Sequence, residues 1–428
     1  MREVRVDGGG GAAGGRGRAG GAGALLRGVL LPAAQALPPD YVAFQAWDAA
    51  QGLCSYVRGM LVQAALLEGL GVGRAGSTAA AAALQSFWKD ASGQVTGVAF
   101  ATCGAPAFDV RPKQYRFLAD CLNNAGLACS LLAPRLAGAG LFLPLACAGS
   151  ACAAACGVAA GASRAAFGQH FAQGGAGIGL ADLQAKEGVQ ETAVSLLGAA
   201  LGTLVLRIAG DSLLLHWVVF AALTVAHLFF NARAVRSLSL ATLNQSRLDL
   251  ALRGYIDSKG KAPSPADVAA QEDLLPPIVA RFLDWDPEPS IFLGARLESL
   301  RRASTGDGGV LELARRSSGP FLCRASSGDI LVGLYDSDAS APSAPAVETF
   351  WAFCLASAAR HYLLRHNGEW AQAERDALVW AESERRTGYF EASLRRAGWL
   401  VDDVMSGAER ALEAGPWRLH PGGNEQER

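Results

Sequence analysis

Residues 41–61, YVAFQAWDAAQGLCSYVRGML, decide the fold class of this chain. Apolar side chains recur there with a helical period, which predicts a helix that begins after Pro39. The opposite face carries a continuous polar stripe at spacings of 3, 3, 4 and 3 residues, formed by Gln45, Asp48, Gln51, Ser55 and Arg58. Such a stripe faces either water or polar partners inside a helical, largely apolar protein.

The composition favours buried or membrane-facing helices. Of the 428 residues, 51% are apolar and only 18% are charged, whereas about 25% are charged in a typical soluble protein. The mean hydropathy is +0.20. The formal net charge is −1 and no basic tract is present, so nucleic acid is not an expected partner.

Motifs of catalysis and metal binding are missing from the sequence. The nine cysteines have no C-x-x-C spacing and the six histidines form no H-x-x-x-H pair, which gives no support to a disulfide framework or a zinc site. A G-x-G-x-x-G pattern at Gly71–Gly76 follows a predicted helix, whereas a dinucleotide site needs a preceding strand. We therefore expect no catalytic residue, no metal and no cofactor.

Four long runs carry at most one charge each, at residues 117–133, 136–163, 192–206 and 212–230. About 20 apolar residues span a bilayer, so the second and fourth runs are long enough and the others are marginal. If all four are spans, nine basic residues fall on one side: Arg111, Lys113, Arg116, Arg164, Lys186, Arg233, Arg236, Arg247 and Arg253. The other side has Arg135 and Arg207. This asymmetry follows the positive-inside rule and favours a membrane over the alternative, a large soluble helical core.

The composition divides the chain into four predicted parts. Residues 1–37 are rich in Gly, Ala and Arg, which is typical of a disordered segment or a transit segment. Residues 38–254 form a helical domain, residues 255–290 a linker, and residues 291–428 a small α+β domain. The predicted fold class is therefore mainly α, a membrane-associated helical bundle with a small C-terminal α+β domain.

Within the last part, two short apolar runs separated by SSGD predict a β-hairpin, at residues 321–325 and 330–335. Residues 346–364 and 369–397 predict helices. Residues 399–404 and 416–420 are short strand candidates.

Polar residues at the borders of the apolar runs form a candidate cluster for binding or for structure. Glu187 and Glu191 are one helical turn apart and like-charged, which suggests cations from elsewhere, with Arg164 and Arg116 as the candidates. An unpaired buried Asp48 would be costly, so we expect a cationic partner, with Arg116 and Arg164 as first candidates. The full set is Asp48, Gln51, Lys89, Asp90, Arg116, Asp120, Asn123, Arg164, Lys186, Glu187, Gln190 and Glu191.

Several ordered motifs carry a family resemblance. YVAFQAWDAAQGLCSYVRGMLVQAALLEGLGVG is followed by WKD, DVRPKQYRFLADCLNN, GASRAAFGQH, AKEGVQET and FNARAVRSL. From about Pro38 to Arg253 the chain resembles the root UVB sensitive (RUS) family, which has a DUF647-type domain. It departs from the family pattern at Asn124, where an acid is usual, and at Glu187, where Asp is usual.

The resemblance implies a helical main domain that touches membranes, without an established enzymatic activity. It also implies links to UV-B responses, auxin transport and vitamin B6 homeostasis, plastid placement, and pairing with a second family member. Two functions are therefore predicted. The first is a non-enzymatic membrane-associated protein that acts in signalling or trafficking through protein partners.

The alternative is a small-molecule carrier or transporter whose site is the polar cluster between helices. Lys89, Lys113 and Lys186 are the lysines of the motifs that could form a Schiff base with pyridoxal phosphate. An enzymatic role has the weakest support, because no pair of candidate residues has a catalytic spacing.

Overall fold

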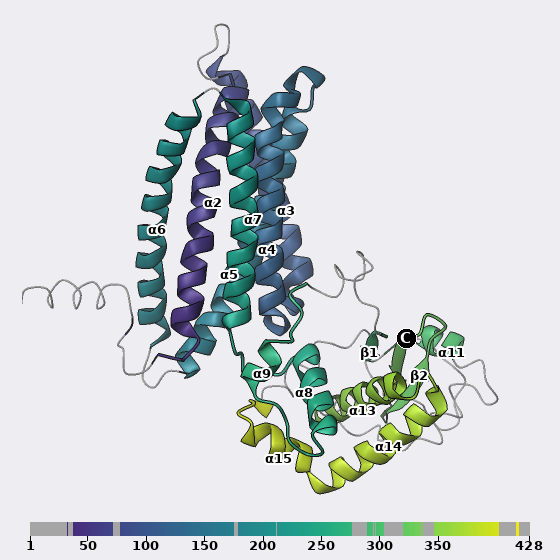
Figure 1. Cartoon of the computed structure of the whole chain (residues 1–428). Coiled ribbons are helices and arrows are strands. Elements are labelled where there is room, and N and C mark those ends of the chain that lie inside the picture. Colours follow the sequence, from purple (N-terminus) through teal and green to yellow (C-terminus); the bar gives the residue numbers. More distant parts are fainter. Residues whose placement is uncertain are drawn as a thin grey trace, which may run out of the picture.

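The computed structural model describes residues 32, 37–71, 78–174, 179–210, 212–275, 289–293, 295, 297–303, 320–333, 335–336, 346–401 and 417–418. In these residues the chain forms a bundle of long helices and a smaller C-terminal part with a short sheet (Figure 1). The predicted fold class, mainly α, is confirmed. Most of the predicted N-terminal segment, residues 1–37, lies outside the described residues.

The bundle consists of α2 (Tyr41–Gly69), α3 (Ala79–Val110), α4 (Pro112–Leu132), α5 (Phe142–Gly174), α6 (Leu180–Ala209) and α7 (Leu213–Ser237). Successive helices run in opposite directions, as short connections dictate (Figure 1). The 3₁₀ helix η1 (Ala133–Ala139) connects α4 to α5. Arg111 alone separates α3 from α4, and Pro112 suits the first helical turn because its missing N–H needs no partner there.

Contacts between distant residues fix the two ends of the bundle. The Oδ2 atom of Asp40 accepts a hydrogen bond from the Ser239 N–H at 2.8 Å and lies 2.9 Å from Nε2 of His170. The start of α2 therefore meets the ends of α5 and α7. At the opposite end, the guanidinium of Arg135 lies 4.0 Å from the Glu68 carboxylate. The C-terminal part adjoins the first of these ends (Figure 1).

Three helices are long and apolar enough to cross a membrane by length and composition, namely α5, α6 and α7. They contain three of the four predicted runs. The run at residues 117–133 is not among them, so its prediction as a span is not supported. It belongs to α4, where Arg116, Asp120 and Asn123 lower the hydropathy and face other helices of the bundle.

Large apolar side chains point outward from three helices of the bundle. On α6 the most closely spaced of them are Leu196, Leu197, Leu201, Leu204 and Ile208, and on α7 they are Leu213, Leu214, Val218, Val225 and Phe229. On α3 they are Leu84, Phe87, Trp88, Val95 and Val98. We call these residues the apolar belt.

The C-terminal part contains α8 (Gln245–Asp257), α9 (Pro265–Ala269), α11 (Leu297–Ala303), α13 (Ala346–Arg365), α14 (Trp370–Thr387) and α15 (Tyr389–Arg396). Its strands are β1 (Ile291–Leu293), β2 (Phe321–Arg324), β3 (Ile330–Gly333), β4 (Tyr335–Asp336) and β5 (Trp417–Arg418). The predicted hairpin is confirmed, because β2 pairs antiparallel with β3 and Phe321 lies opposite Gly333. The helix predicted at residues 369–397 is broken at Gly388, which has a left-handed φ of 67°.

Two further features differ from the sequence pattern. The strand candidate at residues 399–404 forms only a bridge between Leu400 and Thr242, and its last three residues lie outside the described ones. One hydrophobic core joins Leu252 of α8 and Val268 of α9 to Ile330 and Phe390 of the C-terminal part. The helices that the sequence assigns to the end of the helical domain and to the linker therefore pack in the C-terminal core.

Candidate functional site

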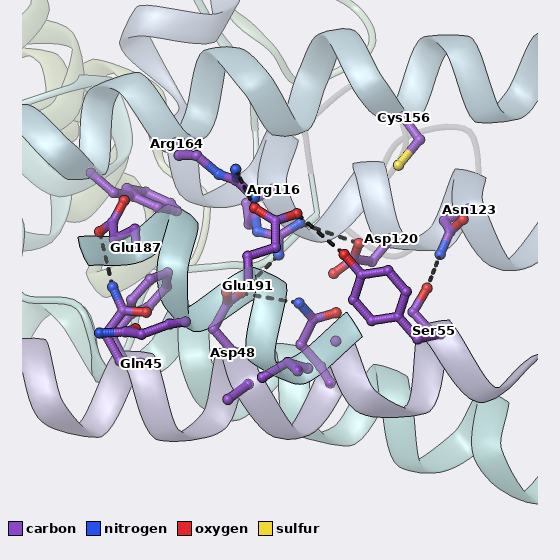
Figure 2. Close-up of a pocket in the computed structure, with 18 residues that line it drawn as sticks. Gln45, Asp48, Ser55, Arg116, Asp120, Asn123, Cys156, Arg164, Glu187 and Glu191 are labelled. Carbon is purple, nitrogen blue, oxygen red and sulfur yellow. Dashed lines mark hydrogen bonds and ion pairs between the residues drawn. The ribbon is translucent and has the colours of Figure 1, made fainter. Parts of the chain in front are cut away.

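A cavity of about 290 Å³ lies between α2, α4, α5 and α6, in the half of the bundle nearest the C-terminal part. The polar stripe of α2 forms one wall, since Gln45, Asp48, Gln51 and Ser55 all line the cavity (Figure 2). The stripe therefore faces partner groups inside the bundle and not only water.

Arg116 is the predicted cationic partner of Asp48. Its Nη2 atom lies 2.8 Å from Oδ1 of Asp48, and its Nη1 atom lies 3.2 Å from Oδ1 of Asp120 (Figure 2). The amide of Gln51 donates a further hydrogen bond to Asp48 at 3.1 Å. One guanidinium therefore serves two carboxylates, and Asp120, only 4% exposed, is the more deeply buried of the two.

The wall formed by α5 and α6 carries the other charges of the cavity. Arg164 Nη1 lies 2.8 Å from Glu191 Oε2, and the side chains are 55% and 46% exposed. This pair places an opening of the cavity at the side of the bundle, between α5 and α6. Arg164 therefore binds Glu191, for which it was a predicted candidate cation, and not Asp48, for which it was a candidate as well. Glu187 accepts a hydrogen bond from the Gln45 amide at 2.9 Å.

A second layer of polar groups lies behind Asp120. Arg58, fully buried, donates hydrogen bonds to the Asn124 side chain and, at 3.0 Å, to the Thr224 hydroxyl. The Asn231 amide donates to Asp120, and Nε2 of the fully buried His227 lies 4.0 Å from the same carboxylate. Sequence reasoning missed His227, although a histidine within the uncharged run 212–230 is a signal that could have found it.

Apolar clusters close the cavity toward both ends of the bundle. Tyr41, Phe171 and Leu183 belong to the cluster on the side of the C-terminal part. Leu61 and Phe220 belong to the cluster on the other side. The cavity is therefore a compartment with a lateral mouth.

The structure brings most of the predicted polar cluster together at this cavity. The lining includes nine of its members: Asp48, Gln51, Arg116, Asp120, Asn123, Arg164, Glu187, Gln190 and Glu191. Lys89 and Asp90 do not line it, because they form their own ion pair on α3 at 2.7 Å. Lys186 is not in the lining either, and Lys113 pairs elsewhere, so none of the three candidate lysines is placed to hold a Schiff base there.

The remaining chemistry of the cavity is that of ion pairs and amides. In the part of the chain that the structure describes, no group of three or more His, Cys, Asp or Glu side chains is arranged to hold a metal ion. Asn123 donates to the Ser55 hydroxyl at 2.9 Å, and the Tyr56 hydroxyl lies 3.4 Å from Glu191. Such an arrangement can bind and orient a polar molecule.

A second charged cluster lies where the bundle meets the C-terminal part. Glu272 binds Lys113 Nζ at 2.9 Å and Arg247 Nε at 3.0 Å, and all three residues are at most 5% exposed. We call these residues the junction cluster. Burial lowers the pKa of the Lys113 ammonium, and the Glu272 carboxylate offsets part of this effect. Since Lys113 starts α4 and Arg247 lies in α8, the cluster ties the two parts together.

The fold and both clusters lie largely within a known domain. The model of the Vitamin B6 photo-protection and homoeostasis domain matches residues 20–259, more than half of the chain. The chain belongs to the RUS family. The matched residues include the whole cavity, whereas Glu272 of the junction cluster lies beyond them.

Relatives from plants and an amoeba support the assignment. The chain is 38% identical over 268 residues to protein root UVB sensitive 3 of Arabidopsis thaliana, which covers 62% of this chain and 59% of that protein. It is 40% identical over 238 residues to RUS family member 1 of Dictyostelium discoideum, covering 55% and 44%. Over 169 residues it is 31% identical to the chloroplastic protein root UVB sensitive 2 of A. thaliana, covering 40% and 38%.

These alignments span about half the length of the curated relatives. No solved structure matches the chain.

Proposed function

We propose that this RUS family protein is embedded in a membrane and binds a small polar molecule in the cavity, as a carrier or transporter does. The observation that carries the proposal is a charged cavity inside a bundle whose outer surface is apolar. Ionisable groups within apolar helical bundles are costly and typically mark substrate or ion pathways. Ligand sites also commonly lie between the helices of a bundle.

Membrane embedding is supported by the apolar belt and by the distribution of charge. On α7 the belt runs from Leu213 to Phe229, which corresponds to about 24 Å at the helical rise of ~1.5 Å per residue. The hydrocarbon core of a bilayer is ~30 Å thick. Basic residues lie toward the end of the bundle that is nearest the C-terminal part. They are Arg164 in the last third of α5 and Arg233 and Arg236 in the last turns of α7, a distribution that agrees with the positive-inside rule.

The cellular roles that the family resemblance implies, and the location of the protein, stay predictions. Signalling or trafficking through protein partners, including a second family member, is compatible with membrane embedding but has no specific contact in its favour. The domain description makes vitamin B6 homeostasis the first broader role to test. The chloroplastic name of one relative favours a plastid membrane as the location. We propose a non-enzymatic protein because the charged groups of the cavity mainly bind one another.

The proposal is tested on the full chain, expressed in membranes and released with a mild detergent. Carbonate washing should leave the protein in the membrane fraction, and release into the soluble fraction would overturn the embedding. Native mass spectrometry of the purified protein should then detect a bound small molecule, with B6 vitamers as the first compounds to add.

Two matched substitutions connect that molecule to the cavity. Ala49 lines the cavity, whereas Ala46 on the same helix is exposed. Ala49→Trp, or the milder Ala49→Leu, should abolish binding by filling the cavity, and Ala46→Trp should leave it unchanged. Equal binding in folded forms of all variants would overturn the assignment of the site.

A further inference from the structure

The cavity carries more negative than positive charge. Its lining contains four carboxylates, from Asp48, Asp120, Glu187 and Glu191, and two guanidiniums, from Arg116 and Arg164. Four negative charges against two positive charges leave a formal excess of two negative charges. No lysine or histidine belongs to the described lining.

The two guanidiniums are already engaged in ion pairs, and one carboxylate, that of Glu187, is left without an ion pair of its own. Arg116 binds both aspartates, and Arg164 binds Glu191. Glu187 accepts a hydrogen bond from the neutral Gln45 amide, and among the described residues it has no ion pair within 4.0 Å. A carboxylate half-withdrawn from water is costly unless it takes up a proton or a positive charge compensates it, so a cationic occupant would stabilise its charged form.

Aromatic rings also line the cavity. Phe44, Tyr56 and Phe167 all line the cavity, and the rings of Phe44 and Phe167 meet edge to face at 5.5 Å. The faces of aromatic rings attract ammonium groups, most strongly where the contact is desolvated. Carboxylates together with aromatic rings are the typical chemistry of sites for alkylammonium ions.

We propose that the cavity binds a small organic ammonium ion, with Glu187 as its counter-ion and the rings of Phe44 and Phe167 beside its alkyl groups. This inference rests on the proposed function and specifies its ligand class. An anion would add to the formal negative excess, and a neutral molecule would supply no positive charge to pair with Glu187. The volume of about 290 Å³ limits the occupant to a small molecule or a headgroup.

The position of the mouth allows two sources for the ammonium group. Arg164 and Glu191 border the lateral opening, and the apolar belt on α6 begins at Leu196, slightly more than one turn beyond Glu191. The mouth therefore lies at the edge of the belt that faces the C-terminal part. An ammonium headgroup of a membrane lipid can reach this level laterally, and a free amine can reach it from water.

The test measures binding to the full chain in detergent with choline, ethanolamine and 3,3-dimethylbutan-1-ol, the uncharged carbon isostere of choline. We expect choline or ethanolamine to raise the melting temperature and the isostere to leave it unchanged. Glu187→Gln should weaken ammonium binding roughly ten-fold or more, because a desolvated ion pair is lost. Glu187→Asp should retain binding, and Glu382→Gln, which changes a 74% exposed carboxylate on α14, should have no effect.

A second experiment with lipids distinguishes the two sources of the ammonium group, a lipid headgroup and a free amine. In nanodiscs, binding of phosphatidylethanolamine or phosphatidylcholine in preference to phosphatidylglycerol would assign the site to a headgroup, whereas binding of the soluble amines alone would assign it to a free amine. Equal binding of choline and its isostere, or unchanged binding in Glu187→Gln, would overturn the inference. If a different co-purified molecule is lost in Ala49→Leu while no ammonium binds, the proposed function stands and this inference fails.

Discussion

The cavity and the junction cluster both hold short ion pairs, but they differ in what surrounds those pairs. At the cavity, Arg116 and Arg164 leave an excess of carboxylates around about 290 Å³ of space. At the junction, two cations share the single carboxylate of Glu272, and Arg247 also donates to the backbone carbonyl of Thr242. The length of an ion pair therefore does not distinguish the proposed binding site from a structural tie, whereas the open space and the unbalanced charge do.

The two clusters also respond differently to the loss of one member. At the junction a surviving charge stays buried without a partner, which costs about 3–5 kcal/mol. At the cavity, water can enter and solvate the survivor, so that the penalty falls with its exposure. Substitutions in the two regions should therefore divide into large and small effects on stability.

Glu272→Gln should give the largest effect. It leaves Lys113 and Arg247 buried side by side without a carboxylate, and we expect the free energy of unfolding to fall by about 3–5 kcal/mol. Thermal or denaturant unfolding of the full chain in detergent measures the change. Glu382→Gln is the control, because its side chain is 74% exposed and a surface change costs about 0.5 kcal/mol or less. Equal stability of the two variants would show that the junction cluster contributes nothing.

Arg116→Met should rank second. It removes the cation shared by Asp48 and Asp120, but Asp120 keeps the hydrogen bond from Asn231 and the cavity admits water. We expect a loss of about 2–4 kcal/mol, compared with about 1 kcal/mol for Asp48→Ala, whose side chain is 28% exposed.

Arg386→Met, at a 76% exposed site on α14, is the control for the change of side chain. A larger loss in Asp48→Ala than in Arg116→Met would contradict the assignment of Arg116 as the shared cation.

The sequence predicts features that depend on local periodicity and misses those that depend on how helices face one another. α2 and the hairpin of β2 and β3 follow from side-chain spacing alone. The pairing of Asp48 with Arg116 follows from the cost of an unpaired buried charge. The sequence predicts Arg164 as a candidate cation for both Asp48 and the pair of Glu187 and Glu191. Which of these it binds depends on the relative rotation of α5 and α6, about which spacing within one helix says nothing.

The junction cluster shows the same limit at the domain boundary. Lys113 and Arg247 counted among the nine basic residues on one side of the presumed membrane, yet both are buried against Glu272. Glu272 lies in the segment with the composition of a linker, where no period marks a buried position. Its partners Lys113 and Arg247 can be identified only from the three-dimensional arrangement of α4, α8 and the chain after α9.

The junction cluster should also make the stability of the protein depend on pH, an effect smaller than those of the substitutions above. Burial lowers the pKa of Lys113 from its ordinary value of 10.5, and Glu272 opposes the shift. Between the folded and the unfolded pKa the unfolded chain binds more protons at this residue. The contribution of Lys113 to stability therefore rises as the pH rises through that window, up to about 10.5.

Parallel melts of the parent and Lys113→Met across the alkaline range measure this contribution. The parent should gain stability relative to the variant as the pH rises. An opposite or absent trend would show that the ammonium of Lys113 is not disfavoured by its surroundings.

Arg164→Ala should have the smallest effect on stability, and it tests the cavity side of the comparison directly. Arg164 and Glu191 are 55% and 46% exposed, and exposed ion pairs contribute about 0–1 kcal/mol. A double-mutant cycle with Glu191→Ala should give a coupling within that range. A loss as large as that of Arg116→Met would mean that the pair is desolvated in the membrane and closes the mouth. A small loss of stability together with altered binding of the small molecule would agree with the exposed position of the pair. The pair would then lie at an open entrance and affect ligand access to the cavity more than folding.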